Sequence, residues 1–195
     1  MAHPKLAANT LKELVDYARA NPGRINWASP GSGSNPHIAL EMLAAANGIK
    51  VVHVPYKGAS QAFTDLVAGQ VDAQYTTFIS AEQHVKAGRM KVLGVSGAKR
   101  QAALPDTPTF TEQGVKGADS TMWIGFVTAA AVPRPVIEKL NAGANKALQM
   151  PDVRARMEQL SVEVEGGSPE KFDAHIKSEA RRIAPLVKSG TLQID

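Results

Sequence analysis

The strongest constraint on the fold is an alternation of helix and strand patterns between about residues 10 and 97. Short apolar segments recur roughly every 20 to 25 residues. Between them, apolar residues recur at helical spacing. This alternation is typical of right-handed βαβ units, in which parallel strands form one sheet. Strands that are apolar along their length also suit a sheet covered on both faces. The sequence therefore predicts an α/β fold.

The predicted elements fall into two groups. In the first, strands are expected at 25–28, 51–54, 71–75 and 92–95, and helices after Thr10 and at 38–47, 60–68 and 80–86. Ser80 and Gln83 have the spacing of a capping box. In the second, strands are expected at 123–128 and 162–164, and helices at about 135–149, 151–160 and 169–188.

The stretch from Asn26 to His37 runs from a strand through a loop of small residues into a helix. Pro36 suits the first helical turn, and Asn35 or Ser34 is the expected cap. Such a loop leaves backbone N–H groups at a helix N-terminus, where the helix dipole also favours negative charge. It therefore predicts a site for a carboxylate or a phosphate. Taken alone, it is equally consistent with an ordinary strand-to-helix connection.

Three such loops are expected at one edge of the sheet, because ligands of open α/β sheets bind outside the carboxyl ends of the strands. The loops span 29–35, 55–60 and 76–80. Tyr56 offers a hydroxyl and an apolar wall, and Lys57 offers charge unless it is simply solvated. Thr76 and Thr77 are neutral donors, and no carboxylate stands beside them to receive a ligand ammonium group.

Composition excludes several other classes of function. The 195 residues are 44% hydrophobic and 21% charged, an ordinary globular balance. No apolar run approaches the roughly 20 residues that span a bilayer. The net charge of +4 is dispersed and not interleaved with aromatic residues, so a nucleic-acid partner is not expected. The absence of cysteine removes disulfides, thiolate nucleophiles and cysteine metal sites.

Catalytic and metal sites are also not expected. Gly31-Ser32-Gly33 begins like a dinucleotide fingerprint, but Pro36 stands where the third glycine belongs. The sequence has neither a Walker-type lysine after a glycine loop nor a nucleophile elbow. His37 and Glu41 lie one helical turn apart without a third metal ligand, so a hydrogen bond on the helix face is the better interpretation. His53 is expected in a strand, and Trp123 as a packing residue.

Several segments, in this order and spacing, resemble the extracytoplasmic solute-binding proteins of tripartite tricarboxylate transporters, the Bug or TctC-like type. The similar segments are Leu11-Lys12-Glu13-Leu14, Ala20-Asn21-Pro22-Gly23, Ser29-Pro30-Gly31-Ser32-Gly33-Ser34, Val54-Pro55-Tyr56-Lys57-Gly58, Gly69-Gln70-Val71-Asp72, Lys86-Ala87-Gly88, Leu104-Pro105-Asp106-Thr107-Pro108-Thr109 and Lys139-Leu140-Asn141. They cover nearly the whole chain.

The resemblance implies a periplasmic protein with a type II-like, Venus-flytrap binding fold. Its ligand would be a small organic carboxylate, namely a di- or tricarboxylate or an aromatic acid, held without cofactor or metal. Its partners would be the membrane subunits of a transporter. By position in the family pattern, the ligand residues would be Ser29, Gly31, Ser32, Gly33, Ser34, Tyr56, Lys57, Gly58, Thr76 and Thr77.

Two departures from the family pattern carry further expectations. Thr76 and Thr77 stand where many relatives carry Asp-Asn, which favours a plain carboxylate over an amino acid. The chain also lacks the usual N-terminal third. Residues 10–120 would then form the family's second, ligand-binding domain, and 121–195 an incomplete C-terminal segment of the first.

The incomplete first domain leaves an exposed sheet edge and uncovered helix faces, so a homodimer or a swapped oligomer is expected. Two other functions stay open. One is a truncated remnant that binds no ligand and serves as an interaction domain. The other is a small α/β enzyme that acts on an anionic substrate.

Overall fold

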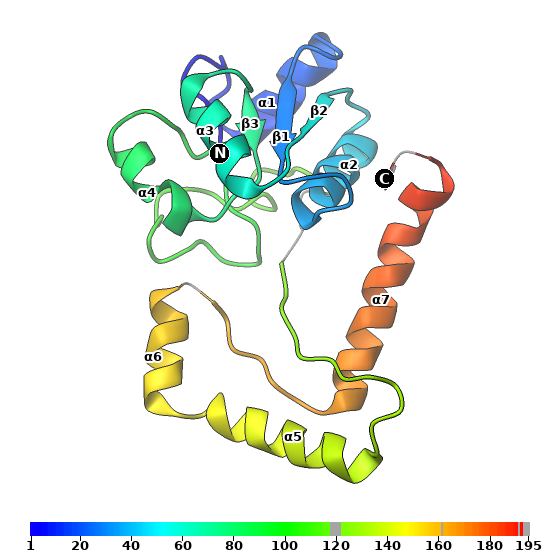
Figure 1. Ribbon diagram of the computed structural model, residues 1–195. Coiled ribbons are helices and arrows are strands. Elements are labelled where there is room, and N and C mark those ends of the chain that lie inside the picture. Colours follow the sequence, from blue (N-terminus) through cyan, green and yellow to red (C-terminus); the bar gives the residue numbers. More distant parts are fainter. Residues whose placement is uncertain (118–121, 161, 191, 193–195) are drawn as a thin grey trace. The chain divides into compact units, whose positions relative to one another are not determined.

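The computed structural model describes residues 1–117, 122–160, 162–190 and 192 of the chain (Figure 1). The chain divides into two compact units. One contains Met1–Met122 and Leu186–Asp195, and the other contains Trp123–Pro185. The boundary predicted between residues 120 and 121 lies outside the described residues.

A parallel sheet forms the centre of the first unit. Its strands are β1 (Asn26–Ser29), β2 (Val52–Pro55) and β3 (Ala73–Gln74), in the order β2-β1-β3. Trp27 lies opposite both His53 and Ala73, and Ala28 lies opposite Val54 and Gln74. The chain thus passes from β1 to β2 on one side and then crosses back over β1 to β3. Right-handed crossovers in opposite directions place their helices on opposite faces of the sheet.

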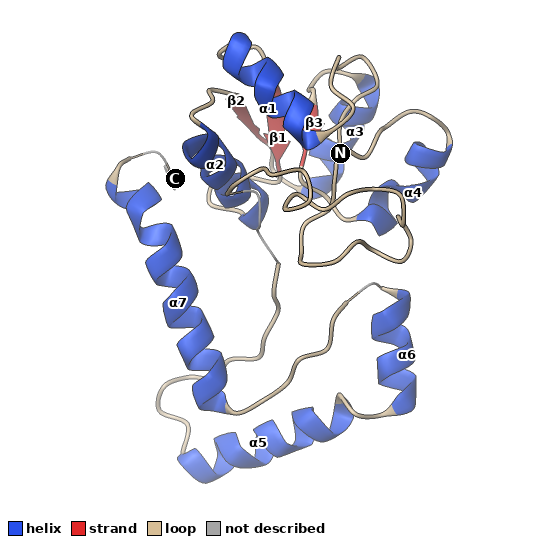
Figure 2. Ribbon diagram, turned by 180° about the vertical axis from the view of Figure 1, so that it is seen from behind, coloured by secondary structure: helices blue, strands red, loops and turns tan. Residues whose placement is uncertain are grey.

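Alternate residues of β1 face two different hydrophobic clusters, as the period of a strand requires. The Trp27 side packs with α1 (Leu11–Ala20) and α2 (Asn35–Asn47). The Ala28 side packs with α3 (Ala59–Ala68) and α4 (Phe78–Lys86). In Figure 2, α1 lies in front of the sheet and α3 behind it. The predicted α/β fold with a parallel sheet is confirmed.

Most helix ends follow the predicted signals. Thr10 caps α1 by accepting a hydrogen bond from the Glu13 amide at 3.1 Å. Gly48 and Gly69 end α2 and α3 at left-handed φ angles of 61° and 72°. The capping box predicted at Ser80 is wrong, because α4 begins at Phe78 and Thr77 is its N-cap. The Ser80 hydroxyl instead lies 2.9 Å from the Thr77 hydroxyl.

The strand predicted at 92–95 is also wrong, because the first residues of the chain take the place beside β3. Ala2 forms antiparallel bridges with Ala73 on one side and Lys91 on the other. The Ala2 amide donates to the Lys91 carbonyl at 2.8 Å, and the Lys91 amide donates back at 2.9 Å. The segment beyond Lys91 is left with one isolated bridge, between Val95 and Thr109.

The second unit contains α5 (Arg134–Ala147), α6 (Pro151–Gln159) and most of α7 (Pro169–Lys188). The strands predicted at 123–128 and 162–164 are wrong, since neither segment pairs with a strand within the described residues. Ile124 and Phe126 are 89% and 93% exposed. Trp123 packs edge-on against Phe172, with ring centroids 5.5 Å apart.

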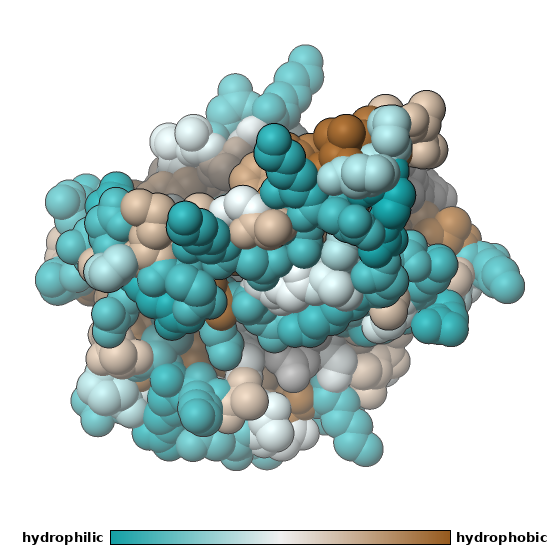
Figure 3. Space-filling view, turned by 90° about the horizontal axis from the view of Figure 1, so that it is seen from below, coloured by the Kyte–Doolittle hydropathy of each residue, from teal (hydrophilic) through white to brown (hydrophobic). Residues whose placement is uncertain are grey.

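Several large apolar side chains of this unit are exposed, among them Val136, Leu140 and Ile176. In the described parts of α5, α6 and α7 no residue is buried. Figure 3 shows hydrophobic residues at the surface in several places on a mainly hydrophilic face. Across the described ranges, none of the helices has both the length and the apolar character needed to span a bilayer.

Candidate functional site

The carboxyl ends of the three strands lie at one edge of the sheet, at Ser29, Pro55 and Gln74. The chain leaves β1 for α2 on one face, but leaves β2 and β3 for α3 and α4 on the other face. The connections therefore diverge at the end of the central strand. In open α/β sheets such a switch point forms the crevice in which ligands bind.

The first turns of the helices that start at this edge carry no negative charge to offset the helix dipoles. The N-caps of α2, α3 and α4 are Ser34, Gly58 and Thr77, and none of them forms a side-chain capping bond. None of the three has an acidic residue in its first turn. By contrast, α1 has both a side-chain cap and Glu13. The positive ends of α2, α3 and α4 thus remain available to an anion.

The loop after β1 is folded back on itself by its own hydrogen bonds. The Gly31 amide donates to Ser29 Oγ at 3.2 Å, and the Gly33 amide donates to His37 Nδ1 at 3.0 Å. Ser34 Oγ donates to the Gly31 carbonyl at 2.7 Å. Within the described residues, Ser32 makes no such bond, so its N–H and hydroxyl are open to a ligand.

The first and second loops are in contact. The Tyr56 amide donates to the Ser29 carbonyl at 3.0 Å. Gly31 has a φ of 152°, and a Cβ placed there would lie 3.3 Å from the Tyr56 carbonyl oxygen. The close approach of these two loops thus depends on glycine at position 31.

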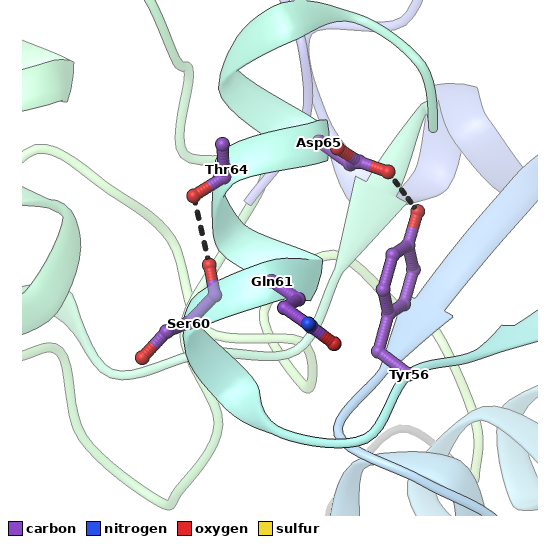
Figure 4. A pocket seen from close by; sticks show the side chains of 5 residues that line it. All are labelled: Tyr56, Ser60, Gln61, Thr64 and Asp65. Atoms are coloured by element: carbon purple, nitrogen blue, oxygen red, sulfur yellow. Dashed lines mark hydrogen bonds between the residues drawn. The ribbon is translucent and has the colours of Figure 1, made fainter.

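The Tyr56 hydroxyl is already engaged. It donates to Asp65 Oδ2 at 2.7 Å, across a pocket that is also lined by Ser60, Gln61 and Thr64 (Figure 4). Burial and the Asp65 carboxylate raise the pKa of Tyr56 to about 12. The carboxylate makes this pocket unsuited to an anion. The Lys57 side chain is exposed, and Gly58 lies at the start of α3.

The third loop contributes hydroxyls of different accessibility. Thr76 is half-buried, whereas Thr77 is exposed and pairs with Ser80. Within the described part of the chain, no hydrogen bond joins either threonine to the other two loops. The structure thus brings the first two groups of predicted residues together and places the third at the same sheet edge.

A pair of stacked histidines behind the first loop was not predicted. The His37 and His53 rings are 3.7 Å apart and within 8° of parallel. His53 Nε2 lies 2.6 Å from Ser29 Oγ. The register explains this, because His53 lies opposite Trp27 and so shares the sheet face of Ser29 and α2. The sequence signal that could have predicted this contact is the period of two along β1, which places Trp27 and Ser29 on the same face of the sheet.

The histidine pair favours the neutral state of both rings. Burial, and then the neighbouring His37, lower the pKa of His53 to about 4. Burial also lowers the pKa of His37 and raises the pKa of Glu41. The Glu41 carboxylate lies 3.6 Å from His37 Nε2, which is too far for a hydrogen bond. The hydrogen bond predicted between them is therefore not formed.

Ser29 and His53 are in contact, as a catalytic nucleophile and its base would be, but a substrate could not reach the Ser29 hydroxyl. Ser29 is fully buried, and its hydroxyl already accepts from the Gly31 amide. Among the described residues, no group of three or more His, Cys, Asp or Glu side chains is placed to hold a metal ion. The geometry suits anion binding by amides and hydroxyls.

Comparison with known proteins agrees with the architecture. The model of the tripartite tricarboxylate transporter family receptor matches residues 1–192. A UPF0065 protein from the tcbD-tcbE intergenic region of Pseudomonas sp. strain P51 is 39% identical over 178 residues, covering 91% of this chain and 53% of its own length. The chain thus spans about half the length of this relative.

Two solved structures are similar along almost the whole chain. One is Rpa4515 of R. palustris with adipate, with a TM-score of 0.84 and 25% identity, covering 98% of this chain and 64% of that one. The other is the periplasmic binding protein BugD, with a TM-score of 0.81 and 32% identity, covering 98% and 65%. The fold is therefore that of the periplasmic binding proteins.

Proposed function

The chain belongs to the tripartite tricarboxylate transporter receptor family, and from this membership we propose that it binds a small organic carboxylate as a solute receptor. The observation that carries the proposal is the set of three helix N-termini, without side-chain caps or first-turn acids, around the end of β1. A structural relative with adipate supports a dicarboxylate as the ligand class.

In this proposal the open Ser32 amide and hydroxyl, with the start of α2, bind one carboxylate group. The hydroxyls of Thr76 and Thr77 lie at the start of α4 and contribute neutral donors. Because no carboxylate stands at positions 76 and 77, a ligand ammonium group would have no partner there. A plain carboxylate should therefore bind better than aspartate or glutamate.

We place the protein in the periplasm, where it would deliver its ligand to the membrane subunits of a transporter. The name of the structural relative BugD as a periplasmic binding protein supports this location. No catalytic step is part of the proposal, since the buried Ser29–His53 pair does not reach a substrate. Absence of turnover with a bound ligand would agree with this, whereas hydrolysis would favour an enzyme.

A thermal-shift screen with mono-, di- and tricarboxylates, aromatic acids, aspartate and glutamate tests the function. A ligand at one hundred times its dissociation constant should stabilise the protein by about 2.7 kcal/mol. We expect adipate or a related dicarboxylate to give this shift. Ser32→Asp should remove it, because a second negative charge at about 4 Å is strongly repulsive, whereas Ser32→Asn should retain it.

Three outcomes would contradict the proposal or a part of it. If no acid shifts a cooperative melting transition, the chain does not bind carboxylates and an interaction domain becomes the better assignment. If only aspartate or glutamate binds, the assignment of Thr76 and Thr77 to a plain carboxylate is wrong. A carboxylate shift that survives Ser32→Asp would place the ligand elsewhere.

We also propose that the apolar segment 122–127 causes self-association. Ile124, Phe126 and Val127 are 89%, 93% and 77% exposed, far beyond the scattered apolar residues of ordinary surfaces. Sedimentation velocity should show a dimer or larger species that dissociates on dilution. The double variant Ile124→Ser, Phe126→Ser should shift the protein toward monomer, and Met150→Ser should not. A monomer at all concentrations would refute this.

A further inference from the structure

The loop that faces the proposed ligand is held from behind by two histidines. His37 Nδ1 accepts the Gly33 amide at 3.0 Å, and His53 Nε2 meets the Ser29 hydroxyl at 2.6 Å. The same hydroxyl accepts the Gly31 amide at 3.2 Å. His37 and Ser29 are 4% and 0% exposed, so water cannot readily replace these bonds. The two ends of the loop, at Ser29 and Gly33, are thus both hydrogen-bonded to the stacked histidine pair.

The bonds require that His37 be unprotonated at Nδ1. An imidazole that accepts a hydrogen bond from an amide becomes a donor when it is protonated, and two donors then face each other. Protonation of both rings would also place two cations in stacked rings whose centroids are 3.7 Å apart. Each event disfavours the folded loop. The shape of the loop after β1 therefore depends on His37 and His53 being neutral, because both rings are hydrogen-bonded to it.

We propose that His37 and His53 are positioning residues for the ligand loop, which hold Gly31–Ser34 in its binding shape as neutral rings and release it on proton uptake. This inference rests on the proposed carboxylate function for its effect on binding. The effect of histidine protonation on the loop itself can be measured without a ligand. The two consequences can therefore be measured separately.

The groups around the pair define the direction of the pH response. From β1 the rings face the uncharged Ser29 hydroxyl, and from α2 they face the Glu41 carboxylate at 3.6 Å. Across the contact with the second loop, the Tyr56 phenol is bonded to Asp65. Glu41 alone would favour a proton on His37, but burial raises the pKa of Glu41 and lowers that of His37. Burial is therefore the dominant effect.

The sign of the stability change follows. The pKa of His53 is about 4 in the folded protein and 6.5 as its ordinary value. The unfolded chain thus binds the proton more readily between these two pH values, so stability is full above about pH 6.5 and falls as the pH drops toward 4. The lowered pKa of His37 acts in the same direction.

The experiment uses variants that keep each bond but cannot titrate. In His37→Asn the amide oxygen can replace Nδ1 as acceptor for Gly33, and in His53→Gln the amide can replace Nε2 beside Ser29. His37→Ala and His53→Ala remove the bonds. Amide hydrogen exchange at Gly33, corrected for the intrinsic pH dependence, reports the loop, and calorimetric titration with adipate reports binding.

In the wild-type protein, the corrected exchange of Gly33 should rise about tenfold between pH 7 and pH 4.5. The double variant His37→Asn, His53→Gln should show neutral-pH protection that changes little with pH, each single variant should show a smaller pH response than the wild type, and the alanine variants should lose protection at every pH. Adipate affinity should follow the same pattern. Protonation of adipate itself is common to all variants, so differences between them report the histidines.

Wild-type protection that does not change with pH would overturn the proposal. So would loss of Gly33 protection at neutral pH in a folded His37→Asn variant, because the bond would then not be what positions the loop. If adipate fails to bind the wild-type protein at neutral pH, the proposed ligand is wrong. Gly33 exchange then still decides whether the histidines position the loop.

Discussion

Replacing Gly31 by alanine should weaken carboxylate binding by about five- to 150-fold, the equivalent of roughly 1–3 kcal/mol of backbone strain. The φ of 152° is one that side chains rarely adopt, and the new Cβ would lie 3.3 Å from the Tyr56 carbonyl oxygen. Relief requires the first loop to move away from the second. Isothermal titration with the acid that gives the largest thermal shift measures the loss.

Gly23→Ala is the matched control for this effect. Gly23 also has a positive φ, 73°, but a Cβ there has open space, and the residue precedes β1 at the other end of the strand. The control should lose stability through the same kind of strain while retaining ligand affinity. Equal losses of affinity in both variants would mean that binding follows global stability and not the shape of the loop.

Leu40→Ala should lower the free energy of unfolding of the first unit by about 2–5 kcal/mol. Leu40 is fully buried in α2, within the cluster that joins α1, α2 and β1. Truncation leaves a cavity that the surrounding helices cannot fill. Trp27 is buried in the same cluster, so a Trp123→Phe background makes its fluorescence the specific reporter during urea unfolding.

Leu140→Ala provides the comparison in the second unit. Leu140 lies on α5 and is 56% exposed, so its truncation should change stability by less than about 0.5 kcal/mol. An appreciable cost, measured by circular dichroism at concentrations where the protein is associated, would show that the apolar face of α5 is buried against another chain. A Leu40→Ala cost below about 1 kcal/mol would contradict the packing of the first unit.

The elements of the first unit were predictable because their signals are local. The Thr10 cap and the glycines at 48 and 69 end or begin helices through contacts with near neighbours in sequence. The strand at 92–95 failed for a non-local reason. Whether an apolar segment joins a sheet depends on which segment already occupies the edge, and here Ala2 occupies it.

The second unit shows the same limit more strongly. Residues 123–128 are rich in strand-forming side chains, yet within the described residues they have no partner strand to satisfy their backbone. Strand propensity describes how well a residue fits a sheet that exists, and it does not create one. Helices α5, α6 and α7 need no such partner for their backbone hydrogen bonds, and their predicted ranges were nearly correct.

The loops of the candidate site could be predicted from the sequence, but the two histidines that hold the first loop in place could not. Glycine, serine and proline between a strand and a helix indicate a loop with free amides from local sequence alone. The stack of His37 on His53 depends on the register of two strands that are 26 residues apart, Trp27 opposite His53. Residues that support a loop from beneath therefore have to be found in the structure.

The hydrogen bonds between Ala2 and Lys91 have a consequence for biosynthesis. At a translation rate of about 5–20 residues per second, roughly 4–18 seconds pass between the synthesis of Ala2 and that of Lys91. Ala2 thus finds this hydrogen-bonding partner long after Ala2 itself has been made. Contacts between such distant residues also slow refolding. The segment around Ala2 would thus stay partly unpaired, and open to chaperones, until residue 91 has emerged from the ribosome.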